Sequence, residues 1–172
     1  MRETIKYIDD NDRSYGLTGM AISMVVLDNG EKLVDINIDR SPEPLGLSHD
    51  FFFSGHQHFS ARRVWSEIAE NFHLAIAMAM GNLLSRKMIL KRDIFDETDE
   101  RDLYNLAVRE GADICGLDSD EVEKIWNKDY NYLRRVFAHP TIQKVAKELA
   151  DEICRRRFIS RQEINDILSQ LM

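Results

Sequence analysis

The sequence predicts an α+β fold that is mainly helical, with an N-terminal β-hairpin packed on a bundle of about five helices. Two observations predict it: strand-like apolar patterns flank a turn motif in the first forty residues, and helical periodicity fills nearly everything after residue 60. At 172 residues the chain has the common size of one domain. We therefore expect a single domain over residues 1–172, made of a β-hairpin segment (1–40), a loop (41–59) and a helical core (60–172).

The hairpin is predicted around Asp28-Asn29-Gly30, which are residues favoured in tight hairpin turns. Before them, Met20 to Leu27 is a nearly continuous apolar run, and after them Val34, Ile36 and Ile38 alternate with polar residues. A two-stranded ribbon is only marginally stable alone. It must therefore pack on helices or pair with a strand of a partner chain.

A long loop is predicted next, because residues 41–59 contain Pro42, Pro44, Gly46 and Gly55. Phe51-Phe52-Phe53 lies within it. Loops of this length inside a domain are uncommon and often functional. The phenylalanines either cover the core or form a contact surface for another protein.

The helical core begins with a helix from a Ser60 cap to Arg86, which is apolar around nearly its full width from Leu74 to Met80. Such a helix is either central in the core or partly in an oligomer interface. Its small residues from Ala75 to Gly81 would let another element approach closely. Four further helices are marked by their end signals: one from about Asp99 to Cys115 before Gly116, one capped by Asp118 or Ser119, one opened by Pro140, and one behind the capping box of Ser160 and Glu163.

Composition excludes several classes of protein. The net charge of −7 argues against a general nucleic-acid binder, and we assign the cluster Arg155-Arg156-Arg157 to a helix end, where cations are favoured. The chain has no signal-peptide core and no apolar segment long enough to cross a membrane, so we expect a cytoplasmic protein. The distant Cys115 and Cys154 are predicted to be free thiols.

One short motif on the first core helix points to metal chemistry. Zinc proteases with an H-E-x-x-H motif place two histidines one helical turn apart, with a glutamate that polarises the metal-bound water. In Ala69-Glu70-Asn71-Phe72-His73, the glutamate and the second histidine are present, and Ala69 replaces the first histidine. Alternatively, Glu70 and His73 simply pair on the helix surface without a catalytic role.

Histidines also gather before this helix. His49, His56 and His58 lie within 25 residues of His73, and the His56-Gln57-His58 segment can put both imidazoles on one zinc or iron ion. A polar loop that happens to contain histidines remains the alternative.

The run from Ala69 to Gly81 resembles the active-site helix of FtsH-type zinc metallopeptidases. Residues 106–113 and 142–168 resemble later helices of that family, so that the likeness covers about residues 64 to 168. It implies Glu70 as catalytic base and His73 as a metal ligand. Ala69 cannot bind a metal, and the family's acidic third ligand has no clear counterpart, Asp118 and Asp120 being the nearest candidates. The resemblance therefore implies a non-catalytic relative.

Two functions follow as hypotheses. The preferred one is a cytosolic non-enzymatic protein without a cofactor, which binds a protein partner or forms a homo-oligomer. The alternative is a metal-dependent hydrolase, with zinc held by His73 together with His56, His58 or Asp120 and with Glu70 as general base. Candidate contact surfaces are the hairpin edge, the small-residue helix and Phe51-Phe52-Phe53.

Overall fold

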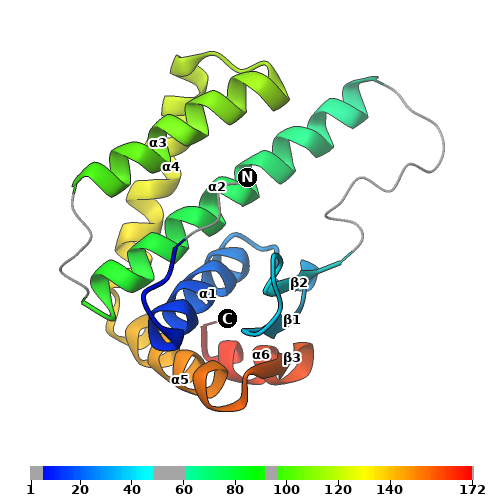
Figure 1. The fold of residues 1–172 in the computed structure, drawn as a ribbon. Coiled ribbons are helices and arrows are strands. Elements are labelled where there is room, and N and C mark those ends of the chain that lie inside the picture. The colour runs from blue at the N-terminus through cyan, green and yellow to red at the C-terminus, as the bar shows by residue number, and fades with distance from the viewer. Residues whose placement is uncertain (1–5, 49–60, 92–96, 172) are drawn as a thin grey trace.

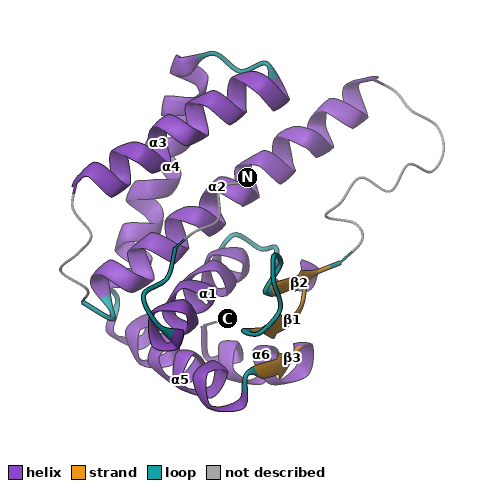
Figure 2. Ribbon diagram, in the orientation of Figure 1, coloured by secondary structure: helices purple, strands orange, loops and turns teal. Residues whose placement is uncertain are grey.

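The fold was analysed in a computed structural model, which describes residues 6–48, 61–91 and 97–171. These residues form six α-helices and one three-stranded antiparallel sheet, and helices dominate the molecule (Figures 1 and 2). The predicted fold class, α+β and mainly helical, is confirmed. In chain order the elements are α1 (Asp10–Val26), β1 (Leu33–Asn37), β2 (Leu45–Leu47), α2 (Ala61–Met88), α3 (Glu97–Glu110) with a π-helical continuation (Gly111–Cys115), α4 (Ser119–Ala138), α5 (Pro140–Arg156), β3 (Phe158–Ser160) and α6 (Arg161–Leu168).

Helix α1 corrects one prediction, because the apolar run from Met20 to Leu27 belongs almost entirely to this helix and forms no strand. The helix starts at Asp9, whose side chain accepts a hydrogen bond from the Asp12 backbone N–H at 2.7 Å. From Ser14 to Met24 the helix is buried on nearly all sides, so its apolar residues show no helical spacing. Asp28, with a φ of 56°, follows the helix end and does not form a hairpin turn.

The sheet has the strand order β2-β1-β3, and both neighbouring pairs are antiparallel. Strand β1 matches the predicted alternating segment, but its partners come from the predicted loop (β2) and from the predicted helical core (β3). Ile36 lies opposite Leu45 on one side and Ile159 on the other, and all three are buried. The register shifts between Leu33 and Asp35, so Leu33 is buried while Val34 is 38% exposed.

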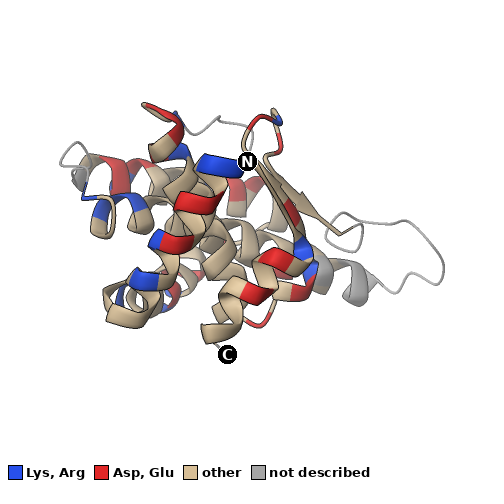
Figure 3. Ribbon diagram, turned by 90° about the horizontal axis from the view of Figure 1, so that it is seen from below, with Lys and Arg blue, Asp and Glu red and all other residues tan. Residues whose placement is uncertain are grey.

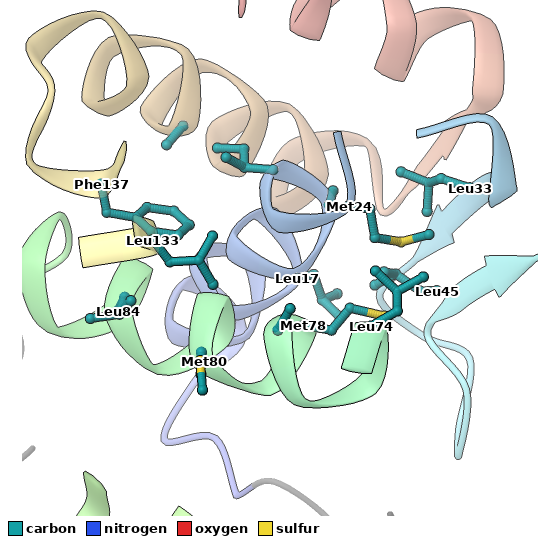
Figure 4. Close-up of a cluster of buried hydrophobic side chains, with 14 of the residues drawn as sticks. Leu17, Met24, Leu33, Leu45, Leu74, Met78, Met80, Leu84, Leu133 and Phe137 are labelled. Carbon is teal, nitrogen blue, oxygen red and sulfur yellow. The ribbon is translucent and has the colours of Figure 1, made fainter. Parts of the chain in front are cut away.

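Helix α2 runs through the centre of the molecule, as predicted, and α1 crosses it at two glycines (Figure 1). A Cβ atom on Gly81 would lie only 2.4 Å from the Gly19 carbonyl oxygen, so the two backbones touch directly. Ala77, Ala79 and Gly81 are buried against elements of the same chain. The small-residue face of α2 is therefore filled within the fold. Figure 4 shows the adjoining core, to which α1, α2, α4, β1 and β2 contribute side chains (Leu17, Met24, Leu33, Leu45, Leu74, Met78, Met80, Leu84, Leu133 and Phe137).

A buried ion pair also joins α1 to α2. Arg86 donates from Nε and Nη2 to the two carboxylate oxygens of Asp12 at 2.6 and 2.5 Å, and the side chains are 5% and 0% exposed. The Tyr7 ring lies 4.9 Å from the guanidinium carbon, and its hydroxyl accepts a hydrogen bond from Asn82. Burial raises the pKa of Tyr7, so its hydroxyl stays protonated.

The C-terminal helices begin where their predicted signals lie. The predicted capping box of Ser160 and Glu163 is present on α6, and Pro140 is the first residue of α5. Of the two predicted caps of α4, Asp118 is the one used, and it forms a further capping box with Glu121. The arginine cluster at the end of α5 pairs with carboxylates: Arg155 with Glu152, Arg156 with Glu163, and Arg157 with Asp10 and Asp39.

Charges of both signs are interspersed along the helices (Figure 3). Among the described residues, no helix has both the length and the apolar character that a membrane span requires. Cys115 and Cys154 are free thiols, as predicted; the first is buried and the second is partly exposed.

Candidate functional site

Glu70 and His73 of α2 line a small cavity, which we call the Glu70–His73 cavity. Its other described lining residues are Leu27 and Asn29, which follow α1, and Leu74. The cavity has a volume of about 170 Å³ and is partly open to solvent. It is small compared with typical pockets for drug-sized ligands, which hold about 300–1,000 Å³. A ligand of a few heavy atoms would fill it.

His73 is held by a carboxylate from another helix. Its Nε2 atom contacts Oδ2 of Asp129 on α4, and the Asp129 side chain is only 3% exposed while that of His73 is 40% exposed. An ionised carboxylate only accepts hydrogen bonds, so Nε2 carries the proton in the neutral imidazole. The second nitrogen, Nδ1, is then left as an acceptor.

The C-terminal end of α1 forms the other side of the cavity. Asn29 is fixed there by its backbone N–H, which donates to the Met24 carbonyl at 2.8 Å, and by its side-chain Nδ2, which donates to the Leu27 carbonyl at 2.7 Å. Tyr132 of α4 donates from its hydroxyl to the Val26 carbonyl at 3.0 Å. The Tyr132 bond connects the end of α1 to α4, and no bond among the described residues uses the Asn29 Oδ1 acceptor.

The structure brings together only some of the residues that the sequence predicts for the site. Glu70 and His73 line one cavity, but the bonding partner of His73 is Asp129 and not Glu70. Asp120 is exposed in the first turn of α4, nine residues and therefore about 14 Å along the helix from Asp129. It does not join His73. His49, His56, His58 and Phe51-Phe52-Phe53 lie outside the described residues.

A zinc site is not completed by the part of the chain that the structure describes. Within it, no group of three His, Cys, Asp or Glu side chains is arranged to hold a metal ion. A structural zinc needs four protein ligands and a catalytic zinc needs three. Glu70 and His73 alone do not meet that requirement.

Asp129 is the site residue that the sequence analysis missed, although its position carries a signal. The buried residues of α4 follow helical spacing, and Asp129 occupies one place in that stripe (Val122, Trp126, Asp129, Leu133, Phe137). A carboxylate at a core position needs a buried partner. Here that partner is His73.

A second surface feature lies where the first part of α2 meets the π-helical segment after α3. Trp65 and Ile114 are each 53% exposed, and the Trp65 indole N–H donates to the carbonyl of Cys115, the neighbour of Ile114, at 3.4 Å. The helical spacing of the sequence from Asp99 to Cys115 predicts that Ile114 faces inward, but the structure contradicts this, because the wider π-helical turn changes the direction of the side chain. We call this feature the Trp65–Ile114 patch.

The start of the π-helical segment is fixed by close packing. A Cβ atom on Gly111 would lie 2.6 Å from a Val122 methyl group and 2.9 Å from the Phe72 ring, so a larger residue does not fit. Gly116 ends the segment with a φ of 65°. Burial raises the pKa of the Cys115 thiol, which therefore stays protonated at neutral pH.

In comparisons with known proteins, the chain matches no family model, no curated protein and no solved structure. The likeness to metallopeptidases therefore stays a prediction from the residues.

Proposed function

We propose that this protein is a non-catalytic binding domain, which contacts a protein partner or a second copy of itself through the Trp65–Ile114 patch. One observation carries the proposal: an indole ring is about half exposed, yet its N–H is bonded to the Cys115 carbonyl. Tryptophan is the residue type most enriched among those that dominate binding energy. A side chain that is already held in place loses little conformational entropy when a partner covers it.

The surroundings of His73 support a non-catalytic role for the metallopeptidase-like helix. Ala69 stands at the position of the first metal ligand, and His73 bonds to a buried carboxylate that links α2 to α4. This bond supplies the buried carboxylate with a partner and joins the two helices. A bound metal ion is therefore not needed to explain why His73 and Asp129 lie together.

The patch can be tested by photo-crosslinking in the cells that make the protein. A photoreactive amino acid at position 114 is compared with the same amino acid at position 158, since Phe158 is also an exposed apolar residue, 46% exposed on strand β3. We expect a discrete adduct from position 114 only, and its loss on Trp65→Ala. No adduct from position 114, or the same adducts from both positions, would contradict the proposal.

Self-association is measured separately by sedimentation velocity over a range of protein concentrations. If the partner is a second copy, the wild type forms a dimer that the Trp65→Ala variant does not form. Phe158→Ala is the matched control and should behave like the wild type.

A metal-dependent hydrolase is the second candidate, and one observation favours it. Glu70 and His73 line the same cavity, and a carboxylate behind His73 is the usual way in which a metal-ligating imidazole is oriented. Its remaining ligands would be His56 or His58, which lie outside the described residues. Hydrolysis of an unfolded protein substrate that a chelator stops, and that Glu70→Gln abolishes, would favour this candidate over the first.

A further inference from the structure

The Glu70–His73 cavity has a chemical character that partner binding through the Trp65–Ile114 patch does not explain. Within the described residues, the polar lining keeps three acceptors free, namely the Glu70 carboxylate, Asn29 Oδ1 and, in the neutral imidazole, His73 Nδ1, against one remaining side-chain donor, the second N–H of Asn29 Nδ2. The described lining contains no Lys or Arg. A ligand rich in hydrogen-bond donors would complement these groups.

The electrostatic field at the cavity favours a cation. Helix α1 ends there, and the C-terminal end of a helix carries a partial negative charge. The last turn of α1 contains no basic residue that would neutralise it. Glu70 adds a carboxylate at the cavity, and Asp129 adds a second one behind His73.

The size and the apolar lining of the cavity indicate which kind of cation fits it. Leu27 and Leu74 contribute apolar surface, and the volume of about 170 Å³ accommodates a short chain of atoms. An ammonium group has three donor hydrogens and no acceptor, and methylene groups pack on leucine side chains while the charged end meets acceptors.

We propose that the Glu70–His73 cavity binds a primary ammonium group on a short alkyl chain. This chemistry has two sources, a free short alkylamine and a lysine side chain of another protein. The inference is independent of the Trp65–Ile114 patch, because the two sites share no residue.

The test is a titration of ¹⁵N-labelled protein with n-butylammonium chloride, followed by NMR. We expect saturable shifts of the amide signals of Leu27, Asn29, Glu70 and Leu74, and no comparable response to the neutral n-butanol or to butyrate. Glu70→Gln should weaken the binding by about tenfold or more, which corresponds to the loss of one charge-assisted contact. Glu148→Gln, an exposed glutamate on α5, is the matched control and should bind like the wild type.

A second titration separates the two sources. It uses an acetylated Gly-Lys-Gly amide, and the same peptide with the lysine Nε acetylated as control. Shifts with the lysine peptide assign a lysine side chain, whereas shifts with n-butylammonium alone assign a free amine; both support the inference. Equal shifts with n-butanol, no effect of Glu70→Gln, or saturation by a divalent metal ion without any response to n-butylammonium would overturn it.

Discussion

His73 on α2 and Asp129 on α4 are 56 residues apart in the chain, yet the imidazole Nε2 bonds to the Asp129 carboxylate. The Asp129 side chain is 3% exposed, so water cannot replace this partner without opening the contact between the two helices. The same bond orients the imidazole at the edge of the Glu70–His73 cavity. One contact therefore stabilises the helix pair and shapes the candidate site.

His73→Ala should destabilise the fold, because it leaves the buried Asp129 carboxylate without its partner. We expect a loss of about 1–3 kcal/mol in the free energy of unfolding, measured by urea denaturation. Asp120→Ala is the control on α4, the helix that carries Asp129; Asp120 is exposed, and its loss should cost less than about 1 kcal/mol. Equal losses for the two variants would show that the His73 bond does not stabilise the protein.

Arg86→Met should be more damaging, because it removes the bidentate partner of the fully buried Asp12. Breaking a buried pair from one side costs about 3–5 kcal/mol. Arg157→Met at the end of α5 breaks ion pairs with partly exposed carboxylates and should have a much smaller effect. Thermal unfolding followed by circular dichroism ranks the two variants, and a larger effect of Arg157→Met would contradict the assignment of Arg86 to the core.

Gly81→Ala tests the crossing of α1 and α2. The added methyl group would lie 2.0 Å from Ser23 Oγ and 2.4 Å from the Gly19 carbonyl oxygen, so the helices must move apart. We expect a loss of about 3 kcal/mol, at the upper end of overpacking effects. Gly116→Ala meets no atom within 4 Å and is disfavoured only by its φ of 65°, which should cost about 1 kcal/mol. A Gly81→Ala variant that is more stable than the wild type would contradict the close crossing.

The capping box of α6 should make stability depend on pH in the acidic range. Hydrogen bonds from the Ser160 hydroxyl and backbone N–H, followed by the Arg156 guanidinium, lower the pKa of Glu163 from 4.5 to about 2. Because the pKa is lower in the folded state, the stabilisation is complete above pH 4.5 and is lost as the pH falls to about 2.

Glu163→Gln should therefore flatten the fall of the melting temperature between pH 4.5 and about 2. Differential scanning calorimetry at several pH values measures it, with Glu148→Gln as a control that should keep the wild-type slope. Parallel curves for Glu163→Gln and the wild type would refute a stabilising role of the Glu163 charge.

The helices after residue 60 could be predicted because their end signals and their apolar spacing agree. Pro140, Gly116 and the capping box of Ser160 and Glu163 each lie at the expected helix end. Helix α1 could not be predicted in this way, because it is buried on nearly all sides and its apolar run from Met20 reads equally well as a strand. Strands β2 and β3 have three residues each, too few for alternation to appear.

Two of the four polar residues of the candidate site could be predicted from the sequence. Glu70 and His73 are three residues apart on one helix, so their proximity follows from helix geometry. Asn29 joins the cavity lining, and Asp129 contacts His73, only because α1 and α4 pack on α2, and residue spacing within one helix does not specify that packing.

The central claim is that this protein is a non-catalytic binding domain that holds no metal ion. Elemental analysis of the full chain, purified without a histidine tag, tests this claim most directly. We predict that zinc and iron are far below one equivalent per chain, and that the melting temperature is unchanged after chelation. One equivalent of tightly held zinc in the wild type, lost in His73→Ala, would contradict a non-catalytic role for this helix and would favour the hydrolase.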